Sequence, residues 1–169
     1  IVSGTHAISS CLFAILRPGD QLLSLCGRPY DTLANIIGQD NNIPGTLVDR
    51  GIYYEEVKLD QNEHPDYEAI SAAVNKNTTM VLIQRSRGYS LRPALSTEEI
   101  TKMVRLVREK NSSTIIMVDN CYGEFVELRE PLECGADIMA GSLIKNPGGG
   151  LAPSGGYITG KQELVEKVA

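Results

Sequence analysis

The chain has 169 residues, of which 42% are hydrophobic and 22% charged, and this is the composition of a globular protein rather than a disordered or fibrous one. Its length suits one domain with a sizeable core. The net charge of −5 gives no electrostatic reason to expect nucleic acid or an anionic membrane as a partner, and no apolar run is long enough to span a membrane.

Helical and strand-like patterns alternate along the chain. Apolar residues at helical spacing predict helices, most clearly where Ser96 and Glu99 form a capping box, and continuous or alternating apolar runs predict strands. In chain order we expect a helix over 6–16, a strand over 21–26, a helix over 31–38, a strand over 52–59, a helix over 65–75, a strand over 78–84, a helix over 96–111, and strands over 114–119, 136–142 and 155–160. This alternation predicts an α/β fold with three layers, α/β/α, and a mostly parallel sheet.

Neither end of the sequence coincides with the start or end of a predicted structural element. It begins "IVSGTHAISS", without a methionine or a leader, and ends inside an apparent helix, "KQELVEKVA". We therefore expect residues 1–169 to be one domain of a longer protein. The cysteines form no CxxC pair and no cluster with histidine, so we expect no metal site, free thiols and a cytoplasmic location; they are Cys11, Cys26, Cys121 and Cys134.

Lys145 follows an apolar strand and precedes three glycines in "GSLIKNPGGG". Ligands of such α/β folds bind beyond the carboxyl ends of the strands. A partly desolvated lysine there has a lowered pKa and can attack a carbonyl, whereas the alternative is a surface loop lysine. A nucleotide-binding P-loop is excluded because its glycines precede the lysine. Gly148 to Gly150 would let the backbone pass close to a cofactor or partner subunit.

Asp119 ends another predicted strand. It is either a turn residue or a buried carboxylate that pairs with a cation. Pyridoxal phosphate supplies such a cation, because a carboxylate keeps its ring nitrogen protonated and makes the ring an electron sink. Asp119 followed by Lys145, each at a strand end, is the order that this cofactor requires.

The segment "SGTHA" runs directly into a predicted helix. Free backbone N–H groups at a helix N-terminus bind phosphate, although Ser3 or Thr5 could simply cap the helix. Ser142 is a second candidate phosphate ligand, or a solvated turn serine. Tyr30 follows a strand and either stacks on an aromatic cofactor or belongs to the core.

Two arginines follow the strand over 78–84. Arg85 and Arg87 could each bind a carboxylate or phosphate through two hydrogen bonds. The alternative for both is an exposed position in a loop.

Together, "SGTHA", "IQRSRGY", "VDNCYGEF" and "AGSLIKNPGGG" resemble the fold-type-I pyridoxal-phosphate enzymes. More narrowly, they are similar to the methionine γ-lyase-related group known as aluminium-resistance proteins. The resemblance covers the whole chain. It implies that residues 1–169 form the large, cofactor-binding domain of a transferase-like fold, without its N-terminal arm and small C-terminal domain.

The resemblance implies a role for each matching residue. Lys145 would bind the cofactor covalently and move the substrate's α-proton. Asp119 would pair with the pyridinium nitrogen. The phosphate would be held by Gly4, Thr5 and Ser142.

Tyr30 would stack on the cofactor ring, and Ser86 or Arg87 would lie near the ring hydroxyl. The resemblance also implies a homodimer or homotetramer with its active site at a subunit interface. The arginine for the substrate carboxylate would lie in the missing C-terminal domain.

These expectations favour a lyase that uses pyridoxal phosphate to act on an amino acid as its small-molecule substrate, and C–S bond elimination from a sulfur amino acid is one candidate reaction. An aminotransferase and a non-catalytic, cofactor-binding resistance or regulatory protein are the alternatives. A plain nucleotide-binding protein is disfavoured, because the sequence lacks G-x-G-x-x-G.

Overall fold

Six strands form the sheet at the centre of the chain, whose computed structural model describes residues 1–39 and 43–169. They are β1 (Gln21–Ser24), β2 (Tyr53–Glu56), β3 (Thr78–Gln84), β4 (Ile115–Asp119), β5 (Ile138–Ser142) and β6 (Gly156–Gly160). The order across the sheet is β2-β1-β3-β4-β5-β6. All neighbouring pairs are parallel except β5 and β6, which are antiparallel, so the prediction of a mostly parallel sheet is confirmed.

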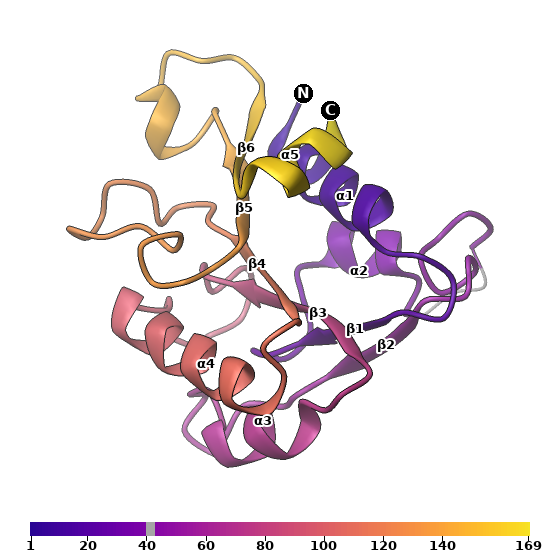
Figure 1. Cartoon of the computed structure of the whole chain (residues 1–169). Coiled ribbons are helices and arrows are strands. Elements are labelled where there is room, and N and C mark those ends of the chain that lie inside the picture. The colour runs from indigo at the N-terminus through magenta and orange to yellow at the C-terminus, as the bar shows by residue number, and fades with distance from the viewer. Residues whose placement is uncertain (40–42) are drawn as a thin grey trace.

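Helices cover both faces of this sheet (Figure 1). They are α1 (Gly4–Ile15), α2 (Asp31–Ile37), α3 (Tyr67–Ala73), α4 (Thr97–Lys110) and α5 (Gln162–Val168). The first, second and fifth helices pack on one face, and α3 and α4 lie together on the other. The predicted three-layer α/β/α architecture is therefore confirmed. None of the helices in the described residues is both long and apolar enough to cross a membrane.

The continuous apolar run of β3 is explained by burial on both sides. Met80 and Leu82 belong to the core under α1 and α2, while Val81 and Ile83 belong to the core under α3 and α4. Consecutive strand residues point to opposite faces, so a strand covered on both faces cannot alternate with polar residues. Each such side chain contributes about 1.5–3 kcal/mol by leaving water.

Capping residues set where the helices begin. The predicted capping box before α4 is confirmed: Ser96 Oγ accepts a hydrogen bond from the Glu99 amide at 3.2 Å, and Glu99 accepts one from the Ser96 amide at 2.8 Å. The first helix begins at Gly4, two residues earlier than predicted, because Ser3 caps it and accepts from the His6 amide. This earlier start brings the N-terminus of α1 to the end of β5.

A buried carboxylate ties three elements together where β5 begins. Asp137 accepts hydrogen bonds from Arg108 of α4 at 2.6 Å, from Lys161 at 2.8 Å and from the amide of Ile116 at 2.7 Å. Burial by itself raises the pKa of Asp137, but these partners outweigh it and hold the pKa below its ordinary value of 3.8. The carboxylate is therefore ionised at neutral pH.

Asp137→Asn is expected to lower the free energy of unfolding by about 2 kcal/mol, because the amide cannot satisfy two cations and a backbone amide together. Since folding lowers the pKa of Asp137, its contribution is fully present above its unfolded value of about 3.8 and is lost as pH falls through the folded value. Urea unfolding at pH 7 and pH 3 measures both effects, with the exposed Glu109→Gln as control. Equal losses of stability at the two pH values would contradict this assignment.

Candidate functional site

The predicted site residues meet in a cavity of about 230 Å³ at the carboxyl ends of the central strands. Six of the seven line it: Gly4, Thr5, Tyr30, Asp119, Ser142 and Lys145. They come from the start of α1, the segment before α2, and the ends of β4 and β5. Arg87, the seventh, lies outside this cavity and lines two neighbouring ones.

The start of α1 packs directly against the end of β5. A Cβ atom on Gly4 would lie 2.8 Å from the Cβ of Ser142, closer than real side chains approach, so a larger residue would push the helix away. Ser142 is 3% exposed. The first backbone N–H groups of a helix have no partner within it and carry its positive dipole end. This cradle of backbone N–H and hydroxyl groups suits an anion of the size of phosphate.

Tyr30 closes the cavity from the side of α2. Its hydroxyl lies 2.9 Å from the Thr5 hydroxyl, and its backbone amide donates to Gln84 at 2.9 Å, so both ends of the residue are fixed. Burial raises the pKa of Tyr30 to about 12, against the opposing effect of the Thr5 hydrogen bond. The ring is therefore a neutral phenol at physiological pH and offers a flat surface beside Asp119.

Asp119 is a buried carboxylate on which the positive charges of Lys145 and Arg92 act. It is 1% exposed, and its Oδ1 accepts from the Cys121 amide at 3.1 Å. Burial raises the pKa of Asp119, although the Cys121 amide and the charge of Lys145 oppose the rise. A carboxylate held this far from water is stabilised by a bound cation.

Lys145 also lines the cavity, three residues beyond the end of β5. Its Nζ lies 4.5 Å from the centre of the Tyr122 ring, and the short 3₁₀ helix Asn146–Gly148 follows it. The backbone conformation after Lys145 requires these glycines. A Cβ atom on Gly148 would collide with the Leu143 carbonyl, and Gly149 and Gly150 have φ of 55° and 78°. These glycines turn the chain sharply after the lysine.

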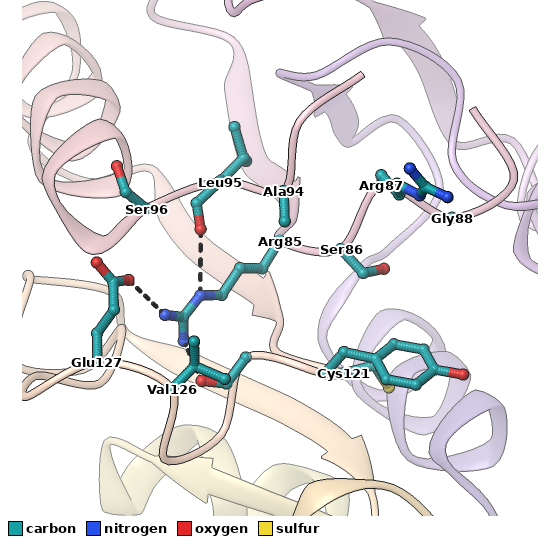
Figure 2. Close-up of a pocket in the computed structure, with 12 residues that line it drawn as sticks. Arg85, Ser86, Arg87, Gly88, Ala94, Leu95, Ser96, Cys121, Val126 and Glu127 are labelled. Carbon is teal, nitrogen blue, oxygen red and sulfur yellow. Dashed lines mark hydrogen bonds and ion pairs between the residues drawn. The ribbon is translucent and has the colours of Figure 1, made fainter. Parts of the chain in front are cut away.

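The two predicted arginines have different positions (Figure 2). Arg85 is buried and donates to Asn120 at 2.9 Å, to the Leu95 carbonyl at 3.3 Å and to Glu127 at 2.6 Å, so its guanidinium is engaged within the chain. The side chain of Arg87 is exposed and points away from this cluster. Arg85 fixes the loop after β4, whereas Arg87 can meet a ligand.

Sequence reasoning missed a polar pair beside Lys145. Glu124 is 4% exposed and accepts from the Tyr157 hydroxyl at 2.9 Å, while its second oxygen has no partner in the described part of the chain. Burial raises the pKa of Glu124. The Glu124 carbonyl also accepts from Asn146 at 3.0 Å, which holds the segment that carries Lys145. The nearest signal in the sequence was that Glu124 closely follows Asp119.

Within residues 1–39 and 43–169, no group of three or more histidine, cysteine or acidic side chains could hold a metal ion. The lining of the cavity offers an amine, a buried carboxylate, a phenol and an anion cradle. These are groups that hold a phosphorylated, cationic, aromatic aldehyde.

A model of the methionine γ-lyase family matches residues 1–169. The chain belongs to this family. Its similarity to solved structures is strong: a candidate cystathionine β-lyase involved in aluminium resistance from Listeria innocua is 56% identical, with a TM-score of 0.96 over 99% of this chain. A carbon–sulfur lyase involved in aluminium resistance from Clostridium novyi NT is 46% identical, with a TM-score of 0.92 over 99% of the chain.

Among curated relatives, the uncharacterised protein YnbB of Bacillus subtilis (strain 168) is 54% identical over 167 residues, 98% of this chain. This methionine γ-lyase family chain spans 40% of that protein, 41% of the Listeria structure and 40% of the Clostridium structure. The resemblance to aluminium-resistance proteins and the transferase-like fold are thereby confirmed. The individual roles of the site residues stay predictions.

Proposed function

We propose that the protein containing this chain is a pyridoxal-phosphate-dependent lyase that breaks a C–S bond in a sulfur amino acid. The observation that carries the proposal is the meeting of Lys145, the buried Asp119 and the Gly4–Ser142 cradle in one cavity. Membership of the methionine γ-lyase family and the similarity to a carbon–sulfur lyase support it.

The residues of the cavity fit this cofactor. The cradle at the start of α1 would hold its phosphate, and the buried carboxylate of Asp119 would pair with its ring nitrogen. The neutral ring of Tyr30 would lie against the pyridine, and the Lys145 amine would hold the aldehyde. When bound, pyridoxal phosphate supplies an electron sink for the bonds at the α-carbon of an amino acid.

The chain's own residues would perform the proton transfers. Lys145 would take the proton from the substrate α-carbon, since it is the basic amine in the cavity. Asp119 would keep the ring nitrogen protonated throughout, because no other carboxylate lines this cavity within the described residues. Tyr122, under the Lys145 amine, would limit the positions that this amine can take.

We also propose a homodimer or homotetramer with the cavity near its interface. Exposed apolar side chains line this cavity, among them Tyr89, Tyr122 and Ile144. Exposed apolar patches of this kind mark contact sites. The four free cysteines support a cytoplasmic location.

The full-length protein tests the proposed function. It should be yellow when purified, borohydride should fix the cofactor mass on the peptide with Lys145, and a sulfur amino acid should yield ammonia and a 2-oxo acid. A colourless protein that takes up no pyridoxal phosphate would refute the proposal. Amino-group transfer to an added oxo acid would assign it to the aminotransferases instead, and bound cofactor without turnover would indicate a non-catalytic binding protein.

A further inference from the structure

Glu124 is a buried acidic residue to which the proposed function gives no part. It is 4% exposed and does not line the cofactor cavity. Its Oε1 accepts from the Tyr157 hydroxyl at 2.9 Å, whereas its Oε2 is buried without a hydrogen-bond partner in the described part of the chain. Buried polar atoms ordinarily have a partner. This oxygen is therefore available to a group that gains a charge during the reaction.

The turn that carries Glu124 has a strained backbone. Tyr122 and Phe125, which lie on either side of it, have φ of 68° and 62°, in the left-handed region that bulky side chains seldom adopt. Such conformations cost on the order of 1–3 kcal/mol each and are concentrated at functional sites. With this backbone, the Tyr122 ring centre lies 4.5 Å from the Lys145 amine and Glu124 is buried.

Glu124 is packed against residues that precede and follow Lys145. A Cβ atom on Gly141 would lie 2.5 Å from Glu124 Oε1, so only glycine leaves room for the carboxyl group there. The Glu124 carbonyl accepts from the Asn146 side chain at 3.0 Å. Burial raises the pKa of Glu124, and the positive charge of Lys145 opposes this rise. Glu124 therefore ionises most readily when Lys145 carries its proton.

Acidic groups also interact electrostatically with Glu124, namely Asp119, Cys121, Glu130 and Tyr157. Burial raises the pKa of the Cys121 thiol and of the Tyr157 phenol, so both are neutral at physiological pH. The charge of Asp119 would be compensated by the ring nitrogen of the bound cofactor. Glu124 would then be the carboxylate that remains to balance a positive charge on Lys145.

We infer that Glu124 is a positioning residue that acts through Lys145: its buried carboxylate stabilises the ammonium form of this lysine from outside the cofactor cavity. The inference deepens the proposed function and rests on it. When Lys145 takes the α-proton, its neutral amine gains one positive charge, which Glu124 balances. The sulfur leaves with the electron pair of the C–S bond and takes the proton from Lys145, which returns to the neutral amine.

Glu124→Gln tests this inference, because it removes the charge and keeps both the size and an acceptor for the Tyr157 hydroxyl. In the full-length, cofactor-loaded protein, kcat for the better substrate of L-methionine and L-cystathionine should fall at least about tenfold. KM should stay within about twofold, since Glu124 does not line the cavity. The exposed Glu109→Gln is the control and should change neither value.

A second measurement follows Lys145 without turnover. Acetic anhydride acylates only uncharged amines, so peptide mass spectrometry of the cofactor-free, full-length protein gives the pH at which Lys145 is half-maximally labelled. Glu124→Gln should lower this pH by about one unit, because a nearby carboxylate favours the protonated amine. The exposed Lys76 in the same digests should label identically in both proteins.

Glu124→Asp distinguishes the charge from the shape of this side chain. Aspartate keeps the charge and loses one methylene group, so it should retain more turnover and a higher labelling pH than glutamine. A residue that only supports the fold would give the opposite order, because glutamine has the shape of glutamate. Melting temperatures exclude loss of the fold as the cause.

The inference requires both effects. A normal kcat in Glu124→Gln, an unchanged labelling pH, or a glutamine variant more active than the aspartate variant would overturn it and leave the proposed lyase intact. The proposed function fails separately, by a protein that takes up no pyridoxal phosphate. The labelling pH, measured without cofactor, would still show whether Glu124 acts on Lys145.

Discussion

Lys145→Ala is expected to abolish lyase turnover in the full-length protein, with a loss of at least about a thousandfold, since one residue both holds the aldehyde and moves the α-proton. The fold should be preserved. Lys145 is half-buried, and its amine lies over the ring of Tyr122 without a hydrogen bond or an ion pair to the described residues.

Turnover of a sulfur amino acid and borohydride fixation measure the two roles of Lys145 separately. The variant should keep some non-covalent cofactor, because the Gly4–Ser142 cradle and Asp119 are untouched, but borohydride should attach no cofactor to it. Lys76→Ala, in an exposed loop far along the chain, is the matched control and should retain full activity. Covalent fixation in the Lys145 variant would show that another amine holds the cofactor.

Asp119→Asn is expected to lower turnover on the order of a hundredfold or more, because a neutral amide cannot keep the ring nitrogen protonated. The same change should stabilise the cofactor-free protein at neutral pH. Burial raises the pKa of Asp119, so the ionised carboxylate costs stability at every pH above its unfolded pKa, and asparagine removes this cost.

Asp119→Asn is thus expected to lower turnover and to raise the stability of the cofactor-free protein. These opposite effects distinguish a role in the chemistry from a structural role. Thermal unfolding of the cofactor-free proteins at pH 5 and pH 8 is the measurement. The wild type should lose stability relative to the variant as the pH rises, and added pyridoxal phosphate should stabilise the wild type more than the variant. If the variant kept full activity, Asp119 would have no part in the chemistry.

Local patterns in the sequence predicted the fold well. The apolar run over 78–84 predicted β3 residue for residue, and the capping box at Ser96 placed the start of α4. Such signals act between residues close in the chain, through hydrogen bonds of a single turn and the periodicity of one element. The strand ends then located Asp119 and Lys145 at the binding edge of the sheet.

Local sequence patterns could not predict the different positions of the two arginines. Arg85 and Arg87 are two residues apart in the same loop, and no local pattern distinguishes them. The structure buries Arg85 because Asn120 and Glu127, more than thirty residues further along, accept its hydrogen bonds, and it leaves Arg87 exposed. The direction of a loop side chain depends on partners that only the folded chain supplies.

The sequence by itself determined the order of elements, the three-layer class and the residues at the strand ends. Only the tertiary structure decided that Gly4 touches Ser142, that Glu124 meets Tyr157, and that segments after β1 and β3 enclose an arginine-lined cavity. The reason is physical. Periodicity and caps are properties of short segments, whereas the side-by-side position of β1 and β3 arises from packing across the whole sheet.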